Sequence, residues 1–258
     1  MTASDAVKLQ SIDLLRPTPS GSFDADKILR ATLAVVDLDV LTPEDRAELI
    51  TSSFHMRETD RLETFKHARR RDSFVAGRLA AKLALHQHCP DLDPSDVSVE
   101  NGVFDQPVMI SENRKCDIGQ LGVSISHSQS YGAALIFHRA HPMGIDVDVP
   151  SQEDVGPVLA GLDPKTRAQC DRLALSDFRA ASLLWVARES LAKTLTTAMM
   201  SPLALYTPSD ITQKGTCFIL RYENFGQYQT HVWPGAKVWL ALTMPARTEF
   251  EGAGPIWL

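Results

Sequence analysis

The pattern of apolar and polar residues predicts a strand followed by helices in the first part of the chain. Residues 31–40 are apolar and β-branched and then alternate with polar residues, as strands do. Thr42 and Pro43 come next and indicate a helix start, because threonine can cap the first N–H groups and proline fits the first helical turn. A second helical stretch covers residues 59–88, and Pro90 ends it because the residue before a proline avoids the helical region.

Short apolar, β-branched runs predict strands after these helices, and the second half of the chain coarsely repeats the order of the first. The strands are expected at residues 97–99, 108–110, 123–126, 132–138 and 143–149. Residues 151–200 are helical in pattern, with the clearest helix at 178–194. An antiparallel meander follows at residues 217–222, 227–232 and 237–242. This order predicts an α+β fold rather than a parallel βαβ sheet.

We expect an N-terminal arm and two halves. Residues 1–27 are rich in Ser, Thr, Pro and Asp and indicate a poorly packed arm. The N-terminal half then covers residues 28–142, and the C-terminal half covers residues 143–258.

Charge and composition exclude several classes of protein. The formal net charge of -6 argues against general nucleic-acid binding, which needs a positive surface. No apolar run is long enough to span a bilayer, and residues 1–9 carry no apolar signal core. The four cysteines are scattered without a Cys-x-x-Cys pair, so their spacing supports neither a zinc site nor a disulfide framework. We therefore expect a cytoplasmic protein that binds neither nucleic acid nor membrane.

Two aspartates on one predicted strand are the strongest chemical signal. Asp146 and Asp148 point to the same side of the strand, while Ile145, Val147 and Val149 face the opposite side. Adjacent carboxylates repel each other unless a cation lies between them, and hard oxygen ligands favour Mg²⁺. The alternative is a solvated strand end with two surface aspartates.

Three residues of the clearest helix share one face. Trp185, Glu189 and Lys193 are spaced by four. Glu189 is a candidate further metal ligand, and Lys193 is a candidate phosphate contact. The alternative is an ordinary Glu–Lys pair beside a core tryptophan.

Two further segments carry polar groups suited to a ligand. Ser126 and His127 lie where a strand becomes a turn, although serine hydroxyls also stabilise turns without any ligand. Residues 61–82 hold seven basic and two acidic residues. Arg69, Arg71 and Arg78 among them would suit a ligand with several phosphates, while a solvated basic helix face is the alternative.

Together these segments resemble the 4'-phosphopantetheinyl transferases of the large, monomeric, surfactin-synthetase-activating type. That family's signature is Gly-Ile/Val-Asp-x-Glu followed by Trp/Phe-x-x-Lys-Glu-Ser/Ala-x-x-Lys, matched here by residues 144–148 and 185–193. Its Ser-His-Ser element, its Phe-x-x-Gly-Arg helix and its Gly-x-Pro loop are matched at residues 126–128, 74–78 and 101–107. The resemblance runs from about residue 30 to about residue 245.

The resemblance implies a fold of two similar α+β halves, each with helices on a small antiparallel sheet, related by a pseudo-twofold axis. It implies a monomeric enzyme that moves phosphopantetheine from coenzyme A to a serine of an acyl or peptidyl carrier protein. By the matches, Asp146, Asp148 and Glu189 would bind Mg²⁺. Coenzyme A would be contacted by Lys193, Asp146, Ser126 and His127, together with Arg69, Arg71 and Arg78. The catalytic residues would be Glu189, Lys193 and Asp146.

Departures from the family pattern keep other functions open. Asp148 stands where the family usually has glutamate, Arg188 replaces the lysine before the metal-binding glutamate, and Gln129 stands where glycine is common. One alternative is a non-catalytic homologue that binds coenzyme A or a carrier protein. Others are the same fold recruited to another reaction on a carrier-bound intermediate, or an unrelated Mg²⁺-dependent phosphohydrolase. The sequence does not name the carrier protein.

Overall fold

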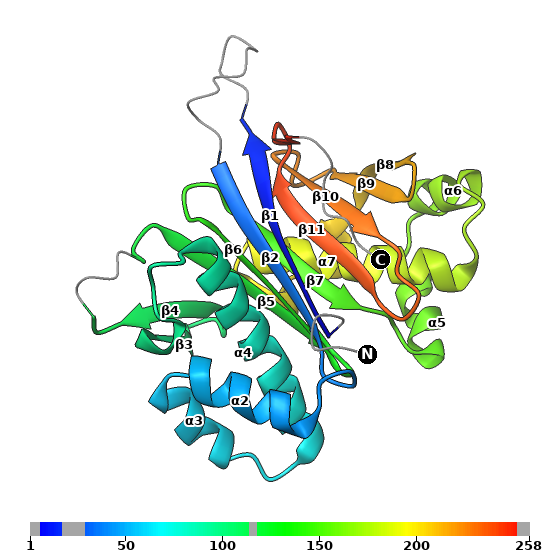
Figure 1. Cartoon of the computed structure of the whole chain (residues 1–258). Helices are drawn as coiled ribbons and strands as arrows, with labels where there is room; N and C mark the ends of the chain where they lie inside the picture. Colours follow the sequence, from blue (N-terminus) through cyan, green and yellow to red (C-terminus); the bar gives the residue numbers. More distant parts are fainter. Residues whose placement is uncertain (1–5, 17–28, 114–117, 252–258) are drawn as a thin grey trace. The chain divides into compact units, whose positions relative to one another are not determined.

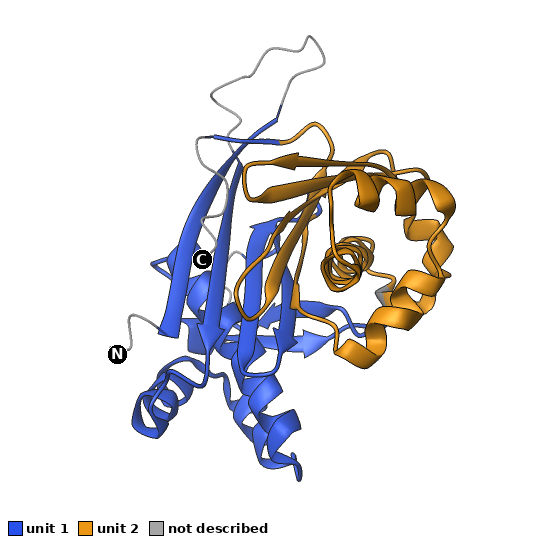
Figure 2. Cartoon of the chain, turned by 90° about the vertical axis from the view of Figure 1, so that its right-hand side faces the viewer, with its two compact units in different colours: residues 1–142, 249–255 blue, residues 143–248, 256–258 orange. Residues whose placement is uncertain are grey.

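The computed structural model describes residues 6–16, 29–113 and 118–251, which form an α+β fold divided into two units (Figures 1 and 2). Residues up to 142, together with residues 249–251, belong to the first unit, and residues 143–248 form the second. Each unit places helices on an antiparallel sheet, so the predicted helix-on-sheet halves are confirmed. The pseudo-twofold axis stays a prediction.

The first unit is built on a five-stranded antiparallel sheet with the strand order β12-β1-β2-β6-β5. Its strands are β1 (Val7–Leu15), β2 (Leu29–Asp37), β5 (Leu121–Ser128), β6 (Tyr131–His138) and β12 (Glu249–Phe250). Three helices follow β2, namely α2 (Pro43–Ser53), α3 (Met56–Glu63) and α4 (Ala68–His88). A separate two-stranded sheet of β3 (Val97–Asn101) and β4 (Pro107–Ser111) follows the short 3-10 helix η2 (Pro94–Asp96).

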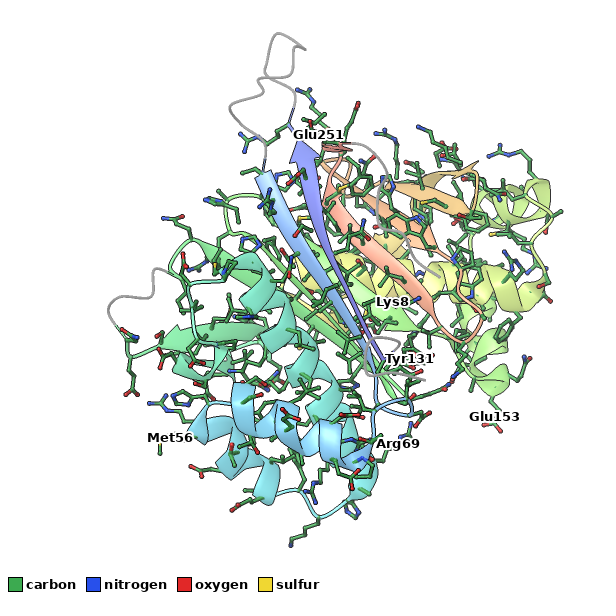
Figure 3. All side chains as sticks on the ribbon, viewed as in Figure 1. Lys8, Met56, Arg69, Tyr131, Glu153 and Glu251 are labelled. Atoms are coloured by element: carbon green, nitrogen blue, oxygen red, sulfur yellow. The ribbon has the colours of Figure 1, made fainter. Side chains whose placement is uncertain are left out.

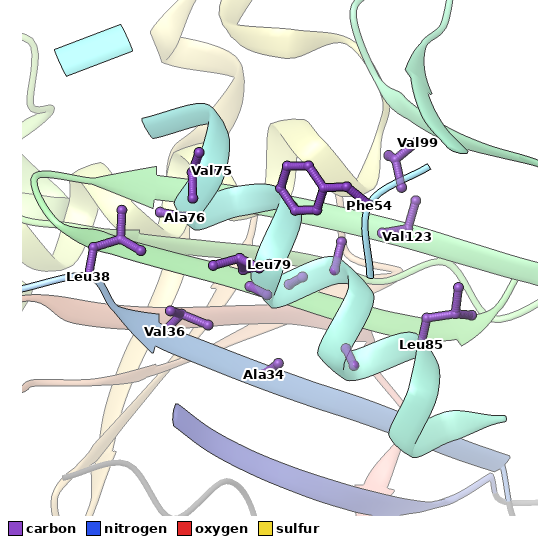
Figure 4. Packing of buried hydrophobic residues seen from close by; sticks show 14 of the residues in the cluster. Ala34, Val36, Leu38, Phe54, Val75, Ala76, Leu79, Leu85, Val99 and Val123 are labelled. Atoms are coloured by element: carbon purple, nitrogen blue, oxygen red, sulfur yellow. The ribbon is translucent and has the colours of Figure 1, made fainter. Parts of the chain in front are cut away.

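Small residues on α4 let this helix lie close to the sheet of the first unit. Ala76, Ala80 and Ala84 recur every four residues and are fully buried. Opposite them, a Cβ on Gly132 of β6 would lie 2.1 Å from the backbone oxygen of Ala76, so only glycine allows this contact. Figure 4 shows the core that results, in which α4 packs its apolar side chains against β2 and β5.

The second unit has a five-stranded antiparallel sheet with the strand order β7-β11-β10-β9-β8. Its strands are β7 (Gly144–Asp148), β8 (Pro208–Lys214), β9 (Cys217–Tyr222), β10 (Tyr228–Trp233) and β11 (Trp239–Pro245). Its helices are α5 (Gln152–Ala160), α6 (Pro164–Arg172) and α7 (Asp177–Thr194), followed by the short 3-10 helices η3 (Ala198–Met200) and η4 (Leu203–Tyr206). The long helix α7 packs on β7, β11 and β10.

The two units share one order of elements. In the first unit β2 is followed by three helices and four strands, and β2 pairs with the last of these, β6. In the second unit β7 is likewise followed by three helices and four strands, and β7 pairs with the last, β11. They differ in the middle strands, because β3 and β4 form their own small sheet whereas β8 and β9 extend the main sheet.

Most predicted elements are confirmed, with corrections at the N-terminus and before the meander. The expected arm over residues 1–27 is wrong for Val7–Leu15, which forms β1 and pairs with β2 from Val7 to Leu14. The apolar positions of this segment do not alternate regularly, so its sequence alone does not predict a strand. The pairing with β2 is what holds it in the extended conformation. Strand β8 extends the meander by one strand that the pattern had not indicated. Among the described residues no helix is long and apolar enough to cross a membrane.

Candidate functional site

Strand β7 directs its two aspartates to the face that α7 covers. Asp146 lies opposite Ala241 of β11, which belongs to the core under α7. Ile145 and Val147 point to the opposite face and are fully buried. Asp146 is itself only 3% exposed, so its carboxylate is buried rather than placed at a solvated strand end.

Helix α7 lies unusually close to β7 because of Gly144. A Cβ at this position would lie 2.4 Å from the backbone oxygen of Ser190 and 2.4 Å from Thr194 Oγ1. The Ser190 hydroxyl donates a hydrogen bond of 2.9 Å to the Gly144 carbonyl oxygen, and this bond is buried. This contact fixes the position of α7 relative to β7 along the helix axis. It thereby determines which residues of α7 face Asp146.

Lys193 meets Asp146 directly. The Lys193 Nζ lies 2.6 Å from Asp146 Oδ1. The Asp146 side chain is 4% exposed and the Lys193 side chain 26% exposed, so this charge-assisted hydrogen bond runs from a buried carboxylate to a partly solvated ammonium. Residues 47 positions apart in the chain are thus brought together.

Asp148 is oriented by the same helix. The indole Nε1 of Trp185 donates a hydrogen bond of 3.0 Å to Asp148 Oδ2. Trp185 is therefore a positioning residue of the site as well as part of the core of the second unit. Its spacing of four from Glu189 was visible in the sequence, but its partner was not.

Glu189 lies half-buried beside both aspartates. Burial raises the pKa of its carboxyl, and the negative charges of Asp146 and Asp148 raise it further, while the Lys193 ammonium acts in the opposite direction. The predicted set of Asp146, Asp148, Glu189 and Lys193 is therefore gathered on β7 and α7. A carboxylate with a raised pKa is better suited to accept a proton than an ordinary glutamate.

A chain of buried hydroxyl groups connects α7 to the sheet. No sequence motif had predicted this chain. Ser190 Oγ lies 2.8 Å from Thr243 Oγ1, which lies 2.7 Å from Thr230 Oγ1. Thr230 Oγ1 in turn lies 2.6 Å from the hydroxyl of Tyr222, which donates to the Ala187 backbone oxygen. Ser190 and Tyr222 each donate their proton to a backbone carbonyl oxygen, so the protons of Thr243 and Thr230 serve the three contacts between the hydroxyl groups.

The carboxylates of this cluster fit a hard cation by their chemistry. Among the described residues, no three His, Cys, Asp or Glu side chains converge closely enough to hold a metal ion. The donors nevertheless are carboxylate oxygens only, the type that Mg²⁺ prefers. The two aspartates raise the pKa of Glu189, so a positive charge near all three would lower their mutual repulsion.

Arg188 does not share the site's face. It is 3% exposed, and its Nε is buried without a hydrogen-bond partner. Burial lowers the pKa of its guanidinium, and the groups that act on it electrostatically are Tyr222, Asp163 and Cys170, on β9 and around α6. Arg188, which stands where the resemblance has lysine, therefore lies near Tyr222, Asp163 and Cys170 and away from Asp146.

Replacing Arg188 by methionine is expected to stabilise the protein. Met has a similar length without a charge to desolvate, so the free energy of unfolding should rise by about 1–2 kcal/mol. Urea unfolding of Arg188→Met measures this gain, and Arg188→Lys, which keeps the charge, is the matched control. A lower stability of Arg188→Met would show that its guanidinium makes a favourable contact.

The remaining candidates lie in the first unit. Ser126 is 5% exposed near the end of β5, and His127 beside it is exposed. A Cβ on Gly77 of α4 would lie 2.9 Å from Ile125 Cγ2 and 4.0 Å from the His127 ring, so the imidazole lies next to α4. In the turn that follows, Gln129 has a φ of 52°, in the left-handed region that glycine adopts more easily than glutamine.

The arginines of α4 divide into two groups. Arg69, which is labelled in Figure 3, is exposed in the first turn of α4, and so is Arg71; this turn contains no acidic residue. Arg78 instead is 7% exposed, with its Nε 3.6 Å from Glu58 Oε1 and its guanidinium 4.9 Å from the centre of the Phe74 ring. Arg78 therefore has partners inside the unit, whereas Arg69 and Arg71 present their charge at the surface.

Comparisons with solved structures find similarity to several chains, two of which are described here. No known protein-family model and no curated protein matches the chain. A holo-(acyl-carrier-protein) synthase from Bacillus anthracis str. Ames, in complex with CoA (3',5'-ADP), is 21% identical over 41% of this chain and 91% of its own, with a TM-score of 0.34. The Thermotoga maritima holo-[acyl-carrier-protein] synthase is 19% identical over 47% of this chain and 68% of its own, with a TM-score of 0.32. At these TM-scores we draw no functional argument from the likeness.

Proposed function

We propose that this protein transfers the 4'-phosphopantetheine group of coenzyme A to a serine of an acyl or peptidyl carrier protein, with Mg²⁺, and releases adenosine 3',5'-bisphosphate. The observation that carries the proposal is the cluster of Asp146, Asp148, Glu189 and Lys193 on β7 and α7. These are the positions at which the chain resembles the phosphopantetheinyl transferases. The three carboxylates and the ammonium of this cluster carry the charges that a metal ion and a phosphate ligand would need. The same residues are the ones that the sequence pattern singles out.

Glu189 is the proposed general base. The hydroxyl oxygen of the carrier serine forms a bond to the β-phosphorus of coenzyme A, and the bond from that phosphorus to the bridging oxygen breaks. The serine proton passes to the carboxylate of Glu189. The leaving group departs with the bridging oxygen as adenosine 3',5'-bisphosphate.

Lys193 is the proposed electrostatic contact to the phosphates. Its side chain is 26% exposed at the end of α7, so its ammonium can reach a ligand while its stem stays against the helix. A positive charge beside a phosphoryl group stabilises the negative charge that develops during transfer.

Asp146, Asp148 and Glu189 would hold the metal. When bound there, Mg²⁺ supplies positive charge that neutralises the pyrophosphate of coenzyme A. The hydrogen bond from Trp185 orients Asp148. The hydrogen bond from Ser190 to Gly144 holds α7 in the position along β7 that places Glu189 beside the two aspartates. Asp148 is shorter than the usual glutamate, and its hydrogen bond to Trp185 gives it a defined orientation.

The first unit would supply further contacts to coenzyme A. Ser126, His127, Arg69 and Arg71 are proposed to bind its phosphates, since hydroxyl, imidazole and guanidinium groups all donate hydrogen bonds to phosphate. Arg78 would have to exchange Glu58 for the ligand before it could contribute.

Mass spectrometry of carrier proteins tests the function. The full chain is incubated with Mg²⁺, coenzyme A and an apo carrier protein from fatty-acid, polyketide or nonribosomal-peptide machinery. We expect at least one carrier to gain the mass of a single phosphopantetheine group on its serine. Absence of this gain with all three carrier types would overturn the transfer and favour a protein that only binds coenzyme A or a carrier. Release of phosphate from simple esters without a carrier would favour a phosphohydrolase.

A further inference from the structure

Lys193 and Asp146 form the tightest ion pair of the candidate site. The pair joins the last turn of α7 to the middle of β7 at 2.6 Å between Nζ and Oδ1. Asp146 is almost completely covered, so its carboxylate obtains its compensating charge from inside the protein. Lys193 is far less covered, and its four-carbon stem allows the ammonium to turn without any movement of the helix.

A metal ion and the Lys193 ammonium would compete for the same carboxylate. Both are cations, and a metal on Asp146 would stand within a few ångströms of the ammonium, where like charges repel strongly in a partly buried site. The backbone cannot relieve this conflict, because Gly144 and the Ser190 hydroxyl hold α7 against β7. The lysine side chain is therefore the part that has to move.

We propose that Lys193 acts as an internal counter-ion that keeps Asp146 from binding a divalent cation until a phosphate-bearing ligand attracts the ammonium away. Asp146 then becomes available to the metal, so the cation and the phosphate ligand bind cooperatively. The last step rests on the proposed function, because coenzyme A is taken as the phosphate-bearing ligand. The competition between Lys193 and a metal ion at Asp146 does not depend on any reaction.

Removing the ammonium is expected to open Asp146 to metal in the protein alone. The probe is Mn²⁺, and the fraction bound to the full chain without coenzyme A is measured by electron paramagnetic resonance. Lys193→Met should bind Mn²⁺ about tenfold more tightly than the wild type, because a competing positive charge has been removed. Lys193→Gln is a second, polar variant in case Met disturbs packing, and Lys193→Arg, which keeps the cation, should show no gain.

Two controls tie the effect to Asp146. Lys165→Met removes an exposed lysine of the same unit, paired with Glu223 at the surface, and should leave Mn²⁺ affinity unchanged. The double variant Asp146→Asn with Lys193→Met should lose the gain. Equal Mn²⁺ affinity in the wild type, Lys193→Met and Lys193→Gln would overturn the proposal, as would a gain that persists in the double variant.

A second arm tests the coupling to the phosphate ligand. Coenzyme A added to the wild type should tighten Mn²⁺ binding by about the same tenfold factor, and it should tighten binding to Lys193→Met by much less. Equal tightening in both proteins would overturn the release of Asp146 by the ligand. If carriers gain mass while the lysine variants bind Mn²⁺ as the wild type does, transfer stands and the counter-ion role falls. If no carrier gains mass while the lysine variants bind Mn²⁺ more tightly than the wild type, the counter-ion role stands and transfer is rejected.

Discussion

Glu189→Gln is expected to lower phosphopantetheine transfer by about 10²–10⁴-fold and at the same time to raise the melting temperature at neutral pH by about 2–4 °C. Transfer falls because glutamine cannot accept the serine proton and is a weaker metal ligand than a carboxylate. Stability rises because the amide has no charge to desolvate between two aspartates. A temperature change of this size corresponds to roughly 1 kcal/mol in a chain of this length.

The stability gain of Glu189→Gln should depend on pH in a defined direction. The pKa of Glu189 is raised in the folded protein above its ordinary value of 4.5. The ionised carboxylate therefore destabilises the fold above the folded pKa, and this penalty shrinks as the pH falls through that pKa. Below pH 4.5 the carboxyl is protonated in both folded and unfolded chains, so the melting temperatures of variant and wild type should converge.

Glu153→Gln is the matched control for this variant. It makes the same chemical change at an exposed position of α5 in the same unit (Figure 3). We expect it to leave transfer unchanged and to shift the melting temperature little at any pH. Normal transfer by Glu189→Gln would exclude Glu189 as base and as metal ligand, and a lower melting temperature at neutral pH would contradict the electrostatic explanation.

Gly144→Ala should damage both the fold and the candidate site of the second unit. The added Cβ would lie 2.4 Å from the Ser190 backbone oxygen, so α7 has to move away from β7. Overpacking of this kind costs about 1–3 kcal/mol, and a displacement of about 1 Å in a catalytic arrangement can cost about 10²-fold in rate. We therefore expect a lower midpoint of urea unfolding together with a large loss of transfer.

The control for Gly144→Ala is another glycine of the same unit. Gly156 lies inside α5, and a Cβ added there meets nothing within 4 Å. Gly156→Ala should be neutral or stabilising by about 0.4–1 kcal/mol, because alanine restricts the unfolded chain without strain in a helix. If both variants behaved alike, the close approach of α7 to β7 would not be what positions the site.

Much of the site was visible in the sequence because its spacings are local. The two-residue period of a strand puts Asp146 and Asp148 on one side of β7, and the four-residue spacing puts Trp185, Glu189 and Lys193 on one face of α7. Both predictions follow from backbone geometry alone. The helix that begins after Thr42 was likewise readable, since its cap and its proline lie within a few residues of each other.

The pairings of the site were decided only by the tertiary structure. Nothing in either motif says that the ammonium of Lys193 contacts Asp146 rather than Glu189, or that Trp185 bonds to Asp148. These contacts depend on the height of α7 along β7, which Gly144 and Ser190 set across 46 residues. Arg188 shows the same dependence, because only the folded chain reveals that its guanidinium is buried near Tyr222, Asp163 and Cys170.

The sequence by itself determined the class of elements, the two halves and the residues that carry charge at the candidate site. Only the tertiary structure decided that Val7–Leu15 joins the first sheet, that β8 extends the second and that Lys193 neutralises Asp146. The physical reason is one of range. Periodicity and capping act over a few neighbouring residues, whereas sheet pairing and the meeting of charges depend on packing between segments far apart in the chain.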